Sequence, residues 1–312
     1  MSPLINAGYN FSMSAPIART IHGAFGEILQ GYTLGPSGFE HFLFTAPVEE
    51  LRCRARLQRT GNAPATALTV SPADRVKALR AYELLGTDLR QPAHGGTIEI
   101  DSNIPVAKGH ASSTADILAT ALLCVAEAYP DTPEPVAHAL ALSVARRLEY
   151  GDYLLHPGVA ACAQRSQTLL ATYETDLRWT IVGVDEGGFV RTEEFHREVP
   201  EDAGKARVYE QLFAELDAAL RADDGAAAAR IATHSAELHN DRLPKKSLED
   251  LQGLKEEFGA LGICVAHSGT LAGLIFSRHD GEHDERVAQC RRALDDLGYT
   301  GSTYTLKEAK RP

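Results

Sequence analysis

Residues 104–115 combine a lysine, small residues and hydroxyls in a spacing that suits phosphate binding, and they read IPVAKGHASSTA. The alternation of apolar residues over 97–101 predicts a strand before this segment, and the Ala- and Leu-rich residues 115–129 predict a helix after it. Unpaired backbone N–H groups at the start of a helix, together with the positive end of its dipole, favour an anion. Gly109 and Ala111 let the backbone approach a phosphate closely. An ordinary capped helix is the alternative, because Ser and Thr are common N-cap residues.

A phosphate loop at this place would bring a defined set of residues to a nucleotide. The spacing is neither that of a P-loop, because Gly-x-x-x-x-Gly-Lys-Ser/Thr is absent, nor that of a dinucleotide fingerprint. Lys108 can offset phosphate charge, although a lysine on an exposed loop is more often solvated. The residues expected to contact the nucleotide are Asn103, Pro105, Val106, Ala107, Lys108, Gly109, His110, Ala111, Ser112 and Ser113.

The composition argues for small-molecule substrates. A net charge of −11 argues against a nucleic-acid or anionic-membrane partner, because either would need a basic face. The five cysteines are odd in number and lie mostly in apolar runs, so we expect reduced thiols. The sequence has no Cys-x-x-Cys pair, which argues against a structural zinc site. With no leader pattern and no run of apolar residues long enough to span a membrane, we expect a cytoplasmic protein. Whether it forms a homodimer stays open.

The elements around the loop predict an α+β protein of two domains, with a boundary near residue 170: 1–170 carries the phosphate loop and 171–312 is an antiparallel-looking α+β unit. A hairpin is predicted where Asp185-Glu186-Gly187 joins two strand-like stretches. The expected strands are 42–46, 51–57, 177–184, 188–192, 263–266, 271–276 and 299–305. The expected helices are 76–85, 115–129, 136–149, 205–222, 226–240, 248–261 and 283–297.

The order Pro-x-x-x-Gly-x-x-Ser-Ser-x-Ala in the loop resembles the phosphate loop of the GHMP kinases. Residues 18–31 (ARTIHGAFGEILQG) resemble the first motif of that family, and 262–273 (GICVAHSGTLAG) resemble the third. The resemblance implies the two-domain GHMP kinase fold, with mixed and antiparallel sheets, helices, and a nucleotide cleft between the domains. It also implies a kinase that uses ATP and Mg²⁺ to phosphorylate a small molecule.

Within the family, all three segments look most like the L-threonine kinases of cobalamin side-chain assembly, which make O-phospho-L-threonine from threonine and ATP. Homoserine, serine or another hydroxy amino acid is the alternative acceptor, and a non-catalytic nucleotide-binding homologue is the alternative class. Two departures from the broad family mark this subgroup. Ala111 replaces a usual glycine, from which we infer a negative φ at that position, and the third motif carries His267 and Thr270 in place of several glycines.

The resemblance assigns roles to individual side chains. Ser113 and Glu149 would hold Mg²⁺, Asp152 would act as base on the acceptor hydroxyl, and Lys108 would assist catalysis. The plain alternatives are a solvent-facing helix residue for Glu149 and a surface turn capped by Asp152. An amino-acid acceptor needs partners for its ammonium and its carboxylate, and Glu27 and Arg19 fit these two needs. The residues expected at the acceptor are Arg19, Glu27, Gln30, His267, Ser268 and Thr270.

Overall fold

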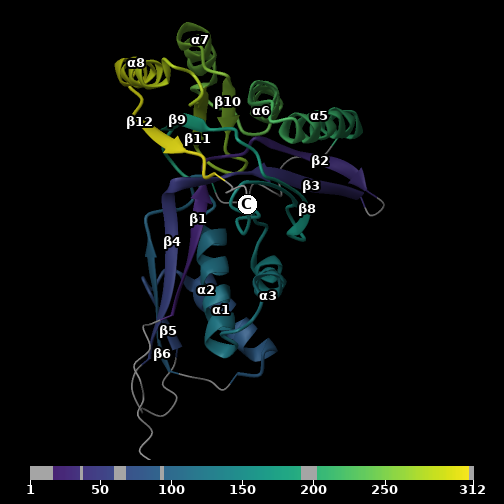
Figure 1. Cartoon of the computed structure of the whole chain (residues 1–312), viewed down its shortest axis with the longest axis vertical. Helices are drawn as coiled ribbons and strands as arrows, with labels where there is room; N and C mark the ends of the chain where they lie inside the picture. The colour runs from purple at the N-terminus through teal and green to yellow at the C-terminus, as the bar shows by residue number, and fades with distance from the viewer. Residues whose placement is uncertain (1–16, 36–37, 60–67, 92–94, 191–201, 309–312) are drawn as a thin grey trace, which may run out of the picture.

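The computed structural model of the chain describes residues 17–35, 38–59, 68–91, 95–190 and 202–308. It contains three four-stranded sheets and a set of helices (Figure 1). The strands are β1 (Ala18–Ala24), β2 (Leu29–Gly35), β3 (Gly38–Thr45), β4 (Pro47–Arg59), β5 (Leu68–Ser71), β6 (Gly96–Ser102), β7 (Val159–Ala163), β8 (Thr168–Tyr173), β9 (Trp179–Asp185), β10 (Gly262–Val265), β11 (Leu271–Ser277) and β12 (Gly301–Thr305). The helices are α1 (Val76–Asp88), α2 (Ser112–Ala128), α3 (Glu134–Leu148), α5 (Ala203–Arg221), α6 (Gly225–Asn240), α7 (Leu248–Phe258) and α8 (His283–Asp296).

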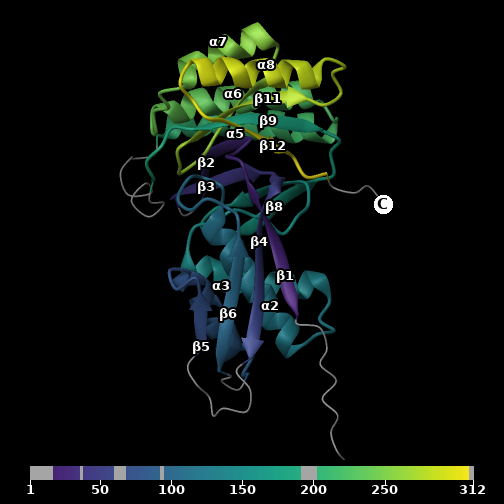
Figure 2. The ribbon, with the colours of Figure 1, turned by 90° about the vertical axis from the view of Figure 1, so that its left-hand side faces the viewer.

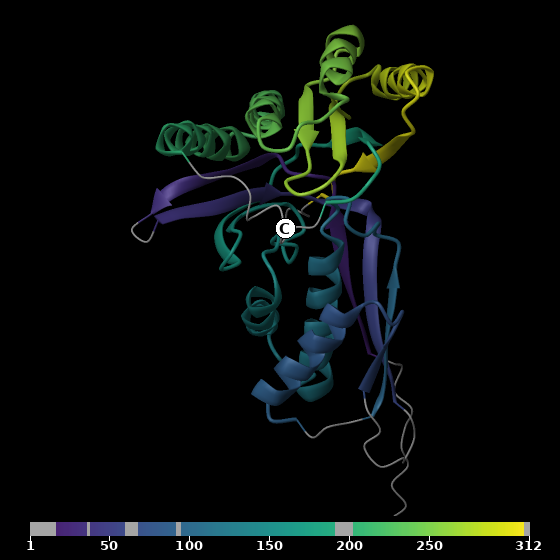
Figure 3. The same cartoon turned by 180° about the vertical axis from the view of Figure 1, so that it is seen from behind.

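The first sheet, in the order β1-β4-β6-β5, carries the phosphate loop at the end of β6. Its strands pair antiparallel except for β5 and β6, which run parallel. In β4, buried residues such as Cys53 and Leu57 alternate with exposed Arg52, Arg54 and Arg56, which is the period of a strand with one solvated face. The helix α2 is buried almost all round because it lies between this sheet and the helices α1 and α3 (Figure 3).

The second sheet, β10-β11-β9-β12, is antiparallel and lies under the helices α7 and α8 (Figure 2). The third sheet, β2-β3-β7-β8, lies between the other two layers, and its strand β2 packs against α5 and α6. Elements from both ends of the sequence therefore share one hydrophobic core, which contains Leu29 and Phe44 as well as Leu216 and Leu220. The predicted boundary at residue 170 falls inside β8, and it stays a prediction.

Most predicted elements are confirmed to within a few residues, but the predicted hairpin after β9 is wrong. Strand β9 pairs with β11 and β12, and residues 186–190 form no strand, while 191–192 lie outside the described residues. The chain is held in two other places: Glu186 N–H donates to the carbonyl of Thr270 at 3.0 Å, and Val190 N–H donates to the carbonyl of Ala107 at 3.4 Å. These tertiary bonds direct the segment toward the phosphate loop. None of the described helices has the length and apolar character that a membrane span requires.

Candidate active site

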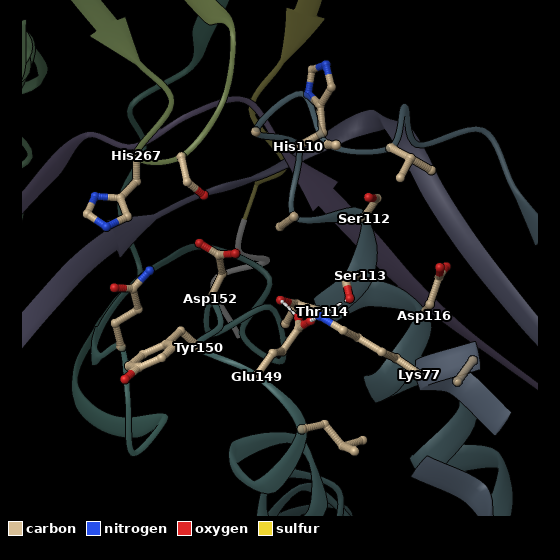
Figure 4. A pocket seen from close by; sticks show the side chains of 18 of the residues that line it. Lys77, His110, Ser112, Ser113, Thr114, Asp116, Glu149, Tyr150, Asp152 and His267 are labelled. Carbon is tan, nitrogen blue, oxygen red and sulfur yellow. Dashed lines mark hydrogen bonds and ion pairs between the residues drawn. The ribbon is translucent and has the colours of Figure 1, made fainter. Parts of the chain in front are cut away.

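A cleft of about 730 Å³ opens where the ends of β6, α1, α2 and α3 approach the third motif. Figure 4 shows its interior, with Ser112, Ser113 and Thr114 on the first turn of α2 and with Asp152 and His267 facing them from the other side. The volume is within the range of small-molecule sites. The cleft therefore has room for a nucleotide phosphate tail and a small acceptor.

The phosphate loop follows β6 and ends at the first turn of α2. Its backbone takes positive φ at three positions: Ala107 (+59°), Gly109 (+104°) and Ala111 (+58°). The inference of a negative φ at Ala111 is therefore wrong, and the alanine stores strain of about 1 kcal/mol or more. Ala111 is also the N-cap of α2 and its methyl group can accept no hydrogen bond, so no side chain caps the first backbone N–H groups. Those donors suit an anion.

The strain in the loop is held by backbone contacts with the first motif. Gly26 N–H donates to the carbonyl of Gly109 at 3.4 Å, and Ala24 N–H donates to the carbonyl of His110 at 3.2 Å. The His110 ring is buried, packs edge-on against Phe25, and bonds through Nδ1 to the carbonyl of Ala24 at 2.9 Å. Burial lowers the pKa of His110, so its imidazole is neutral at physiological pH. Figure 4 shows the ring directed away from Asp152.

The third motif supports the loop from behind. A Cβ on Gly269 would lie 2.1 Å from the carbonyl oxygen of Lys108, and a Cβ on Gly109 would lie 2.3 Å from the Cβ of Ala266. Thr270 N–H donates to the same Lys108 carbonyl at 2.9 Å. The three motifs recognised in the sequence therefore meet in one tightly packed unit.

One corner of the cleft gathers oxygen atoms around Glu149. Its carboxylate accepts from Ser113 Oγ at 2.5 Å and from Thr114 Oγ1 at 2.9 Å, and pairs with Lys77 Nζ at 2.8 Å. The Glu149 side chain is only 8% exposed, so it is not the solvent-facing residue of the alternative interpretation. It follows α3 as the C-cap in an extended conformation, which turns the carboxylate toward α2.

The same corner fits a magnesium ion in its donor chemistry. Mg²⁺ prefers oxygen ligands and keeps several waters, so a carboxylate and a hydroxyl can suffice. Among the described residues, no cluster of three or more His, Cys, Asp or Glu side chains could hold a metal ion. Ser113 and Glu149 bond each other at 2.5 Å, and both line the cleft.

A second pair of carboxyl groups lies deeper, where Glu27 and Asp152 meet. Both accept from Thr45 Oγ1, at 2.5 Å for Glu27 and 3.4 Å for Asp152. Burial raises the pKa of Glu27 well above its usual value, and the neighbouring Asp152 adds to that rise. Burial also raises the pKa of Asp152, whereas the hydrogen bond with Glu27 lowers it. The pair therefore shares a proton, with Glu27 the more protonated partner, and Asp152 lies in the cleft and not in a surface turn.

Six of the predicted site residues do not line the cleft: Arg19, Gln30, Asn103, Pro105, Lys108 and Thr270. Arg19 is near the start of β1, five residues from Ala24, which is about 16 Å along an extended strand. Asn103 bridges backbone groups of Arg52 and Glu50, at 2.8 and 2.7 Å. These two side chains serve the sheet and not the cleft.

Three of the remaining residues belong to hydrogen-bond and ion-pair networks beside the cleft. The ammonium of Lys108 pairs with Asp185 at 2.8 Å and donates to the carbonyl of Gly188 at 2.7 Å, and Thr270 Oγ1 donates to Asp185. Gln30 accepts from His267 Nδ1 at 3.0 Å, so it positions a histidine that does face the cleft. The predicted residues that line the cleft are Glu27, Val106, Ala107, Gly109, His110, Ala111, Ser112, Ser113, Glu149, Asp152, His267 and Ser268.

Sequence reasoning missed several cleft residues outside the three motifs. Arg75 pairs with Asp116 at 2.9 Å, and Lys77 reaches Glu149 from the first turn of α1. Tyr150 and Arg165 also line the cleft. No spacing in the sequence links them to the loop, because they lie on separate elements that only the fold brings together.

Comparison with known proteins finds a matching family model and two similar kinases. A family model described as the GHMP kinases N terminal domain matches residues 76–163. The chain is 28% identical over 267 residues to an L-threonine kinase of Citrobacter freundii, covering 83% of this chain and 86% of that protein. It is 26% identical to an L-threonine kinase of Salmonella typhimurium, covering 82% of each.

Solved structures show the same fold at low identity. The mevalonate kinase of Methanococcus jannaschii superposes with a TM-score of 0.71 at 12% identity, covering 96% of this chain and all of that one. The homoserine kinase of Cytophaga hutchinsonii gives 0.68 at 15% identity, covering 96% and 97%. Residues 76–163 therefore match the GHMP kinase family, and the chain as a whole has the fold of the mevalonate and homoserine kinases.

Proposed function

We propose that this protein transfers the γ-phosphoryl group of ATP to the side-chain hydroxyl of L-threonine, making O-phospho-L-threonine. The observation that carries the proposal is the division of the cleft into an uncapped helix start beside Glu149 and a buried carboxyl pair at Asp152. The two relatives that are called L-threonine kinases support threonine as the acceptor. A step in cobalamin side-chain assembly, as in the subgroup that the motifs resemble, is the metabolic setting that would go with this acceptor.

At the phosphate end, the first N–H groups of α2 and the loop backbone would bind the β- and γ-phosphates. Ser113 and Glu149 would hold Mg²⁺, which when bound offsets phosphate charge during transfer. Lys77 already bonds Glu149 at 2.8 Å, so its ammonium would lie beside the transferred group. These residues serve positioning and charge stabilisation, which dominate catalysis of phosphoryl transfer.

At the acceptor end, Asp152 would take the proton of the threonine hydroxyl as the new P–O bond forms. Burial raises the pKa of Asp152 toward neutral pH, which suits a general base. Glu27 would hold the shared proton and donate it in a hydrogen bond to the Asp152 carboxylate, which keeps that carboxylate oriented. A protonated Glu27 carries no charge to attract the substrate ammonium, so another group would take the role that the sequence suggests for Glu27.

The experiment that tests the proposal is a comparison of Asp152→Asn with the wild-type protein on threonine, serine and homoserine. The asparagine keeps the shape and removes the base, so kcat for threonine should fall at least about tenfold while ATP binds normally. Asp131→Asn is the control, because Asp131 is an exposed carboxyl between α2 and α3 and should leave turnover unchanged.

Three outcomes would contradict parts of this proposal. Full activity of Asp152→Asn would remove the base assignment but keep the kinase. A higher kcat/KM for serine or homoserine than for threonine would change the acceptor. Binding of ATP without phosphorylation of any of the three would favour a non-catalytic nucleotide-binding homologue.

A further inference from the structure

We infer that Gln164 and Arg165, which follow β7, bind the main-chain groups of the acceptor: Arg165 its carboxylate and Gln164 its ammonium. This inference rests on the proposed function, because it takes an α-amino acid as the acceptor. It names the residues that would select this substrate class, and it replaces Arg19, which lies outside the cleft.

The first observation is the state of the cations that line the cleft. Arg75, Lys77 and Arg147 each pair with a carboxylate, at 2.9, 2.8 and 2.6 Å. Within the part of the chain that the structure describes, Arg146 and Arg165 have no such ion pair. A guanidinium with unused donors binds a carboxylate through two parallel hydrogen bonds, so these two residues are the candidates for an acidic ligand group.

The second observation places Arg165 at the acceptor end. Its guanidinium carbon lies 5.8 Å from the centre of the Tyr150 ring, so the aromatic face holds the cation without neutralising it. Figure 4 shows Tyr150 on the same side of Glu149 as Asp152, whereas Lys77 lies on the opposite side. Arg165 therefore belongs to the wall that faces the acceptor and not to the wall that faces the phosphates.

The third observation concerns its neighbour Gln164, which is only 3% exposed and lines the same cleft. Its backbone is fixed on both sides: its N–H donates to the carbonyl of His41 at 2.8 Å, and its carbonyl accepts from Gly151 N–H at 3.3 Å. Its Oε1 atom is buried and has no hydrogen-bond donor among the described residues. A buried acceptor without a donor costs free energy, and an ammonium entering the cleft would remove that cost.

The two side chains complement an α-amino acid. Such a molecule carries an ammonium and a carboxylate on one carbon, and consecutive residues here offer a carbonyl oxygen and a guanidinium. Gly151 links this pair to the base, because the residue that bonds the Gln164 carbonyl directly precedes Asp152. With its main-chain groups held by Gln164 and Arg165, the acceptor side chain is left to reach Asp152.

The test compares threonine with threoninamide, which keeps the ammonium and hydroxyl but has no carboxylate charge. Arg165→Ala should lower kcat/KM for threonine about 10- to 100-fold, mainly through KM, because it removes one charge-assisted contact. It should change kcat/KM for threoninamide little and leave the KM for ATP unchanged. Arg165→Lys should restore part of the preference for threonine, since it returns the charge without the planar fork. Arg146→Ala is the matched control and should keep the wild-type preference.

Each result separates this inference from the proposed function. If Arg165→Ala phosphorylates threonine with the wild-type preference over threoninamide, the inference is overturned while the kinase stands. If Arg146→Ala loses the preference in its place, the carboxylate binds near α3. If the wild-type protein phosphorylates neither compound, the proposed function fails, and calorimetry of threonine binding then decides: binding that Arg165→Ala abolishes supports the inference, and no binding to the wild type overturns it.

Discussion

Replacing Gly109 by alanine should weaken ATP binding while the rest of the protein stays folded. The new Cβ would lie 2.3 Å from the Cβ of Ala266, at a backbone φ of +104° that an alanine rarely adopts. The φ strain costs about 1–3 kcal/mol and the steric overlap about as much again, so the loop must move to relieve them. The movement would break the contact of Gly26 N–H with the Gly109 carbonyl and misalign the phosphate donors.

Calorimetric titration with ATP, together with thermal unfolding, measures both effects. We expect the dissociation constant for ATP to rise at least tenfold, about 1.4 kcal/mol, with a native-like circular dichroism spectrum. The double variant Gly109→Ala with Ala266→Gly removes the overlap but keeps the φ strain, so it should recover part of the affinity relative to Gly109→Ala alone. Unchanged ATP affinity in a folded Gly109→Ala variant would refute the assignment of this loop to the phosphates.

Two further predictions concern the metal corner and the buried histidine of α6. Glu149→Gln should raise the Mg²⁺ concentration for half-maximal turnover at least about tenfold, with little change in threonine affinity, because it removes a charged oxygen donor. A Mg²⁺ titration of turnover checks this, with Glu134→Gln at the other end of α3 as the control. A normal Mg²⁺ requirement in Glu149→Gln would show that Glu149 does not bind the metal. Burial lowers the pKa of His239 to about 3, whereas the unfolded imidazole takes up a proton below about 6.5, so acidification from pH 7 to pH 5 should remove about 2 kcal/mol of stability. Urea unfolding at both pH values should show a smaller loss for His239→Gln than for His234→Gln, an exposed position on the same helix, and equal losses would contradict the argument.

The elements of this fold were predictable wherever local pattern decides them. The alternation in β4 and the small-residue segment between β6 and α2 depend on neighbouring residues, and both were confirmed. The sign of φ at Ala111 was not predictable, because contacts with residues near Gly26 hold the loop in that strained form.

The sequence alone also could not show which arginine faces the cleft. Arg19 and Arg165 both lie next to small residues, and only the pairing of β1 with β4 and the turn after β7 decide which one faces the cleft. The hairpin after β9 failed for a similar reason, since bonds to Thr270 and Ala107 redirect the chain. Long-range contacts, and not local propensity, set these features.

The two sets of side chains proposed to bind the acceptor and the nucleotide lie on different kinds of element, and this separation bears on how such an enzyme could change its substrate. Thr45 is the last residue of β3 and Gln164 follows β7, and these strands are paired neighbours. The groups around Ser113 and Glu149, by contrast, lie at the ends of α2 and α3. If the proposed roles hold, substitutions confined to the strand ends would alter which molecule is accepted while the residues proposed to bind the nucleotide stay unchanged. A cleft arranged this way could acquire new acceptors, through evolution or engineering, by changes on its acceptor side alone.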